Sequence, residues 1–222
     1  MPEFPAAPVP PAELLEQFLP AAFAERGAPP GAEAVKVALG VRLEGEGGGE
    51  WLVEVAEGRV AIRPGERDGA AFSYVQSVED WRGALWEGRG GWVGKGAAAL
   101  FRPGASEARA AADLVGGALP AVLEAMAPIR GHLRVVVTGP EGAWQVGLQL
   151  GPGEIPAEPT AVVHVASEDV DEMIAGALNP IEAFMAGRIR VTGDMTLLLQ
   201  IQAAQMQAAG SLAGGAKAGG TG

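Results

Sequence analysis

Short stretches of alternating hydrophobic and polar residues follow one another along most of this 222-residue chain. Because successive side chains of a strand point to opposite faces, this alternation, together with an enrichment in β-branched residues, predicts β-strands. The predicted strands cover residues 35–43, 51–55, 71–76, 132–138, 144–150, 160–166 and 188–192. Glycine-rich turns separate the first two strands of each half, which favours hairpins.

Helical spacing of apolar residues predicts amphipathic helices at 11–26 and 106–127, ahead of each group of strands. Four residues suited to helix caps mark further helix starts, and these are Ser77, Ser167, Asn179 and Asp194. Proline at the first helical position follows Asn179, and a long apolar helix follows Asp194 to about residue 209. Strands grouped with helices in this way predict an α+β fold, with helices over one face of a sheet.

Four short motifs occur in the same order in both halves of the chain. They are an Ala-acid-Leu segment followed by Leu-Pro-Ala, a Gly-x-Trp-x-Val segment, a serine with Glu-Asp close behind it, and a Gly-Arg pair before a triplet ending in glycine. The first copies begin at Ala12, Gly49, Ser77 and Gly88, and the second copies at Ala112, Gly142, Ser167 and Gly187. Four matches in register predict a tandem duplication.

The first copy is the shorter one. Residues 81–86 lead to Gly88 without an Asn-Pro helix, and Pro103 and Gly104 end the last helix of this copy, predicted at 96–101. We therefore expect two units, at residues 8–103 and 104–209, each a mainly antiparallel sheet of about five strands covered by helices. A flexible tail is expected at 210–222.

Residues 177–195, ALNPIEAFMAGRIRVTGDM, resemble the C-terminal signature of the sterol carrier protein-2 (non-specific lipid-transfer) domain family. The shared features are a helix with a proline and an aromatic residue, Met-x-Gly-Arg, an alternating strand, Gly-Asp and an apolar final helix. The resemblance extends over about residues 106–209 and is much weaker over 8–103. It implies an apolar tunnel between sheet and helices that binds a fatty acyl chain, a sterol or an isoprenoid-type lipid without chemistry.

Flexible methionine and leucine side chains in the second unit are suited to the wall and lid of such a tunnel, because they adapt to varied ligands. The candidate ligand-binding residues are Trp144, Val146, Met173, Ile174, Phe184, Met185, Ile189, Val191, Met195, Leu198 and Ile201. In the first unit the equivalent volume would be filled by Trp51, Trp81, Trp86 and Trp92. The alternative for all these residues is ordinary core packing against the sheet.

An excess of acidic side chains, 27 against 16 basic ones, gives the chain a net charge of −11. This charge repels nucleic-acid backbones and anionic lipid headgroups, so no nucleic-acid partner is expected. The chain has no cysteine, which excludes disulfides and suits a reducing compartment. With neither a secretory signal nor a long uninterrupted apolar stretch, we expect a cytoplasmic protein without stable membrane insertion, and a homodimer is left open.

Catalytic motifs are weak in this sequence. The two histidines, His132 and His164, both fall in predicted strands, and no serine lies in a Gly-x-Ser-x-Gly turn. An acidic cluster at 168–172 begins a helix, where negative charge is favourable without a metal. We therefore predict a non-catalytic carrier of a hydrophobic ligand, with no cofactor and no metal. The alternatives are a structural or interaction module with a filled core, and an enzyme, which would need a buried polar pair near one of the histidines.

Overall fold

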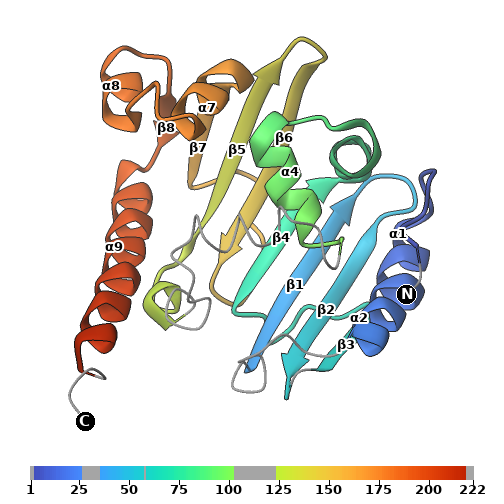
Figure 1. The fold of residues 1–222 in the computed structure, drawn as a ribbon. Coiled ribbons are helices and arrows are strands. Elements are labelled where there is room, and N and C mark those ends of the chain that lie inside the picture. Colours follow the sequence, from blue (N-terminus) through green and yellow to red (C-terminus); the bar gives the residue numbers. More distant parts are fainter. Residues whose placement is uncertain (1–2, 27–35, 58, 103–123, 219–222) are drawn as a thin grey trace.

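One sheet runs through both halves of the chain. The structure is a computed structural model that describes residues 3–26, 36–57, 59–102 and 124–218, with side chains as far as Gln207. Within these residues the sheet has eight strands in the order β3-β2-β1-β4-β6-β5-β7-β8 (Figure 1). The mixed sheet and its helices confirm the predicted α+β class.

The strands of the two halves are connected in the same way. The first half supplies β1 (Lys36–Glu44), β2 (Gly49–Ala56), β3 (Arg59–Pro64) and β4 (Phe72–Ser77), and the second supplies β5 (Gly131–Gly139), β6 (Gly142–Leu150), β7 (Ala161–Ala166) and β8 (Arg190–Gly193). In the first half β1 pairs antiparallel with β2 and parallel with β4. In the second half β5 pairs antiparallel with β6 and parallel with β7. The tandem duplication stays a prediction, to which this shared connectivity adds support.

The two halves join where β4 pairs antiparallel with β6, from Phe72 opposite Leu150 to Val75 opposite Gly147. Strand β6 therefore lies beside β4 as β8 lies beside β7. The first half has no described strand equivalent to β8, and the second half covers the edge that such a strand would cover. This pairing explains why the structure has one continuous sheet, with four described strands from each half, where we expected separate sheets of about five.

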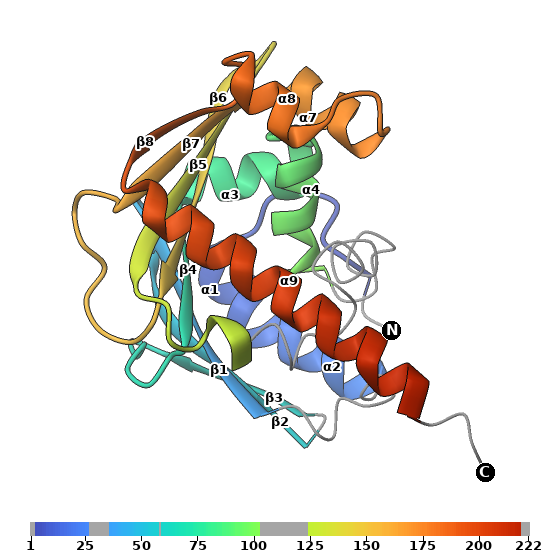
Figure 2. The same ribbon diagram turned by 90° about the vertical axis from the view of Figure 1, so that its left-hand side faces the viewer.

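All the described helices lie over one face of the sheet (Figure 2). They are α1 (Pro11–Glu13), η1 (Leu14–Phe18), α2 (Leu19–Arg26), α3 (Val78–Arg82), η3 (Gly83–Glu87), α4 (Gly91–Ala99), α7 (Ser167–Ile174), α8 (Pro180–Met185) and α9 (Met195–Ala218). The first three form one continuous helical segment, in which η1 is a wider π-helical turn. The other face of the sheet is crossed only by loops in the described part of the chain (Figure 2).

Aromatic side chains fill the space between helices and sheet in the first half. Trp81 packs edge-on against Trp86 and Phe101, and Phe101 packs against Tyr74 of β4. Trp51 of β2 is buried, and its indole nitrogen donates a hydrogen bond of 2.8 Å to Glu16 of η1. Trp86 and Trp92 are partly buried against the same cluster. These aromatic side chains form a packed core in the first half.

Several predicted boundaries differ from the structure. Strand β3 was not expected, and α4 begins at Gly91 instead of residue 96. Ser77 caps α3 as predicted, through a 3.0 Å bond from the Asp80 amide. The prediction for Ser167 is wrong, because Ala166 is the cap and Ser167 is already helical. Most of the helix predicted at 106–127, and the unit boundary at 103–104, lie outside the described residues.

Candidate functional site

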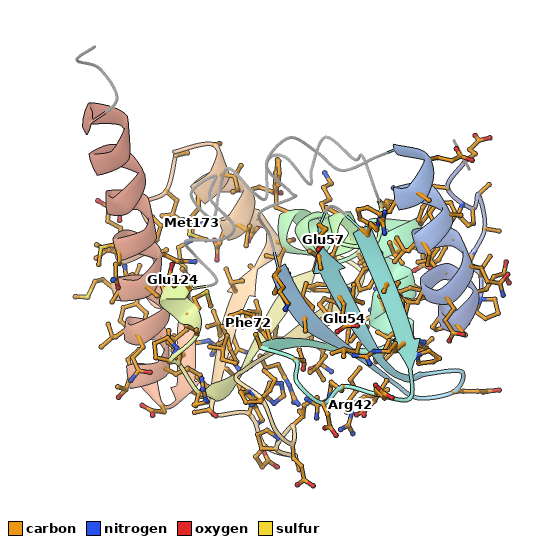
Figure 3. The ribbon with its side chains drawn as sticks, turned by 90° about the horizontal axis from the view of Figure 1, so that it is seen from below. Arg42, Glu54, Glu57, Phe72, Glu124 and Met173 are labelled. Carbon is orange, nitrogen blue, oxygen red and sulfur yellow. The ribbon has the colours of Figure 1, made fainter. Side chains whose placement is uncertain are left out.

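The final helix meets the sheet through a narrow apolar contact. Leu197, Ile201 and Ala204 lie at helical spacing on one side of α9, and Leu197 and Ala204 are buried. They join one hydrophobic cluster with sheet residues Leu133, Leu148, Leu150, Ala161 and Phe72. We call these eight residues the α9–sheet layer. Phe72, the first residue of β4, lies between α9 and strands β1 and β2 in the view of Figure 3.

The start of α9 is a glycine turn that is hydrogen-bonded to the sheet. Gly193, with φ of 86°, takes a left-handed conformation that favours glycine. The next residue, Asp194, caps the helix by accepting a 2.8 Å bond from the Thr196 amide, and these bonds to Thr196 lower the pKa of the Asp194 carboxyl. The Asp194 amide donates to the Thr160 carbonyl at 2.8 Å. Helix α9 is therefore attached to the sheet at its first residues and by one side of its following turns.

An ion pair holds the α7–α8 segment in place. Arg188, directly after the left-handed Gly187, donates to Asp169 at 2.6 Å and to Glu172 at 2.7 Å. Asp169 is buried, and the bonds to Asp169 and Glu172 raise the pKa of Arg188. The pair fixes the end of α8 on α7.

A similar pair occurs in the first half, where Arg89 follows the left-handed Gly88. Its guanidinium lies 3.6 Å from Asp80, the third residue of α3, as Asp169 is the third residue of α7. Burial raises the pKa of Asp80, with smaller opposing effects from Ser77 and Arg89. The Gly-Arg motif noted in the sequence therefore has the same structural use in both halves.

A pocket of about 250 Å³ lies at the end of the β5–β6 hairpin. Its lining combines the turn of that hairpin with residues 87–91 and the first turns of α7, and it includes Arg89, Trp144, Ser167 and Asp171. Trp144 is almost fully buried, with its indole nitrogen donating to the Asp80 carbonyl at 2.8 Å. The lining is mixed polar and apolar, so this pocket differs from the predicted apolar tunnel, and such a tunnel is not shown.

Buried polar groups of the first half form a structural network. The Tyr74 hydroxyl donates to the Gln76 side chain, whose amide donates to the Gln145 carbonyl at 2.6 Å. Burial, and then the nearby Asp80, raise the pKa of Tyr74 well above its ordinary value. The Tyr74 phenol therefore keeps its proton, so it acts as a hydrogen-bond donor and does not serve as a general base.

His132 lies on the face of the sheet away from the helices. It is 1% exposed, and neither ring nitrogen has a hydrogen-bond partner in the described residues. Burial, and then the charge of Arg134, lower the pKa of His132. Its cross-strand neighbour is the buried Gln149. A buried polar pair therefore exists, but the side-chain amide of Gln149 does not ionise near neutral pH, so the pair supplies no acid–base couple.

The predicted ligand-binding residues separate into two groups. Trp144 is buried, and Val146, Met173 and Ile189 are partly buried against the larger hydrophobic cluster, while Ile201 belongs to the α9–sheet layer. Val191 and Leu198 are half-buried. Exposed side chains make up the rest, and these are Ile174, Phe184, Met185 and Met195. The structure therefore brings only part of the set together.

Sequence reasoning omitted most of the α9–sheet layer. Leu133, Leu148 and Ala161 are strand residues whose alternation marks one face, and Leu197 lies four positions before Ile201. This spacing was visible, but the neighbouring Met195 and Leu198 made a second apolar stripe of equal strength. The described residues contain no group of three or more metal-ligating side chains, and none of their helices is long and apolar enough to cross a membrane.

Comparison with known proteins gives a consistent family match. Residues 115–206 match the model of the SCP-2 sterol transfer family. Hydroxysteroid dehydrogenase-like protein 2 from Xenopus laevis is 33% identical over 85 residues, which are 36% of this chain and 20% of that protein. The same-named protein from Danio rerio is 35% identical over 66 residues, 28% of this chain and 16% of that protein. The chain thus spans about a fifth of the length of the curated relatives it matches.

A solved structure, the sterol carrier protein domain 2 of Helicoverpa armigera, is 27% identical and covers 44% of this chain and 81% of its own, with a TM-score of 0.30.

Proposed function

We propose that this chain binds and carries a hydrophobic ligand, such as a fatty acyl chain, a sterol or an isoprenoid-type lipid, because residues 115–206 match the model of the SCP-2 sterol transfer family. The proposed site is the α9–sheet layer, and the chain performs no chemistry on its ligand. The proposed place of action is the cytoplasm, because a cysteine-free chain suits a reducing compartment.

The observation that supports this site best is the way α9 is attached. Of the described side chains of α9, one stripe, Leu197, Ile201 and Ala204, reaches the hydrophobic cluster on the sheet. Gly193 forms the left-handed turn from β8 into this helix, and outward movement of α9 would begin after this turn. When the helix moves outward, an alkyl chain could take the place of this stripe against the sheet. Burial of the alkyl chain would then offset the loss of the contacts between the helix and the sheet.

Apolar burial would supply the affinity. Each buried methylene contributes about 0.8 kcal/mol, so a long acyl chain gains on the order of 10 kcal/mol before the cost of immobilisation is subtracted. The expected dissociation constant is in the micromolar range, which corresponds to a binding free energy of about −8 kcal/mol.

Two neighbouring alanines of α9 provide a matched test of this site. Ala204 is buried against the sheet, whereas Ala203 is exposed. A tryptophan at residue 204 occupies the space that the ligand would take, so Ala204→Trp should weaken binding of a fluorescent hexadecanoic acid by about tenfold or more. Ala203→Trp should bind like the wild type. Thermal melts of both variants check that each is folded.

Absence of saturable binding to the folded wild-type chain would overturn the proposed function. Equal affinity of the two variants would instead place the ligand elsewhere in the molecule, for example in the 250 Å³ pocket beside Trp144.

The second candidate function is an interaction module with a filled core. It is favoured by the aromatic packing of the first half, where Trp81 and Phe101 are almost fully buried. Under this alternative the wild-type chain binds no fatty acid, and Ala204→Trp lowers only its stability.

A further inference from the structure

Helix α8 has an unusual distribution of its side chains. Ala183 is fully buried, whereas Ile181 is 69% exposed and Met185 is 79% exposed. Phe184 is also exposed. A short helix that buries its alanine and exposes its large apolar residues is the reverse of the usual surface helix. Packing among the described residues therefore leaves these three large side chains exposed.

Helix α9 also exposes large apolar side chains. Its stripe Leu197, Ile201 and Ala204 faces the sheet, and Met195, Leu199 and Met206 lie exposed on the opposite side. Both helices lie on the same side of the molecule, with α8 above α9 (Figures 1 and 2). We call Ile181, Phe184, Met185, Met195, Leu199 and Met206 the α8–α9 surface. Of the eight large apolar side chains exposed among the described residues, seven fall between Ile174 and Met206.

Charge separates this region from the rest of the chain. Residues 175–206 contain two arginines and two acids, and no charged residue occurs between Asp194 and Lys217. The whole chain carries a net charge of −11. A neutral apolar surface on a strongly acidic molecule is suited to a partner without net charge, because a negative partner would be repelled by the remaining surface.

We infer that the α8–α9 surface docks the chain on a zwitterionic lipid bilayer, an inference that rests on the proposed carrier function. Isoleucine, phenylalanine, methionine and leucine side chains enter the boundary between headgroups and acyl chains, where their burial drives binding. A second copy of this chain fits less well, because two bodies of charge −11 repel each other. Docking places Gly193, between α8 and α9, next to the lipid from which a ligand is taken.

Flotation with phosphatidylcholine vesicles tests this inference. The double variant Ile181→Gln and Leu199→Gln changes one residue of each helix, and neither residue belongs to the α9–sheet layer. Loss of two exposed aliphatic groups should weaken vesicle binding by about tenfold or more. Leu100→Gln is the matched control, because Leu100 is 61% exposed outside this surface. It should bind vesicles like the wild type.

Three outcomes of the flotation experiment overturn the inference. They are absence of the wild type from the floating fraction, equal binding by the double variant and the control, and binding that requires added phosphatidylserine. Dimerisation in sedimentation experiments that the double variant abolishes, with no vesicle binding, assigns the surface to a second copy and also overturns it.

Fatty-acid titration in vesicle-free solution separates this result from the proposed function. The double variant should keep the wild-type affinity there. Vesicle binding without any fatty-acid binding leaves the docking surface standing and refutes the carrier function.

Discussion

Leu197→Ala tests how α9 is held on the sheet. Leu197 is 2% exposed and belongs to the cluster that joins α9 to β5, β6 and β7. The substitution removes buried carbon atoms that contribute about 0.8 kcal/mol each, and it leaves a cavity. The free energy that holds α9 on the sheet should therefore decrease by about 3 kcal/mol. Leu199, two residues further along the same helix, is 59% exposed. Leu199→Ala should therefore cost less than about 0.5 kcal/mol.

The loss should appear as local opening of α9. Because the described side chains of α9 reach the sheet through one stripe, we expect the helix to leave the sheet without unfolding β1–β6. Amide hydrogen exchange measures this opening residue by residue. A cost of about 3 kcal/mol corresponds to exchange roughly 150-fold faster in residues 198–204 of Leu197→Ala, with the amides of β5 and β6 unchanged.

Two results would refute this reasoning. Equal exchange of α9 in Leu197→Ala and Leu199→Ala would mean that the stripe facing the sheet does not hold the helix. Equally accelerated exchange throughout the sheet would mean that α9 is part of one cooperative unit and cannot open alone.

Two further predictions concern stability. Gly96→Ala should stabilise the chain by about 1 kcal/mol, because Gly96 lies in α4 with open space where a β-carbon would be added. Gly94→Ala should destabilise the chain, because the added β-carbon meets the Arg89 carbonyl. Urea unfolding of both variants measures the two effects. Burial lowers the pKa of His132 in the folded chain, so the unfolded chain binds the proton first as the pH falls. The free energy of unfolding should therefore decrease below the ordinary pKa of 6.5, by up to about 1.4 kcal/mol per pH unit. Urea unfolding at about pH 7.5 and about pH 5.5 should show this fall in the wild type and in His164→Gln but not in His132→Leu.

Local signals in the sequence were sufficient for most of the elements. Alternation located seven of the eight strands, and the side chains of Ser77, Asn179 and Asp194 cap helices as predicted. Strand β3 escaped because it is an edge strand in which exposed and half-buried residues alternate without a fully buried position. A strand without a fully buried residue needs few large apolar side chains, so its hydrophobic pattern in the sequence is weak.

Pairing between distant segments could not be predicted. The β4–β6 contact depends on which strand edge is left open after each half has folded, and local periodicity carries no information about that. The phase of α9 has a similar origin. Both stripes of this helix are apolar, and the direction in which the chain leaves Gly193 determines which of them faces the sheet.

The β4–β6 junction also bears on why we propose a ligand site in the second half and none in the first. In the first half, β6 covers the edge of β4, and aromatic rings fill the space under the helices. Opening that space would require moving several large rings together, at a cost that a single bound chain would not offset. In the second half α9 contacts the sheet through Leu197, Ile201 and Ala204, in one cluster with the buried Met126 and Ile129. These aliphatic contacts are therefore the ones that the ligand we propose would exchange for its own.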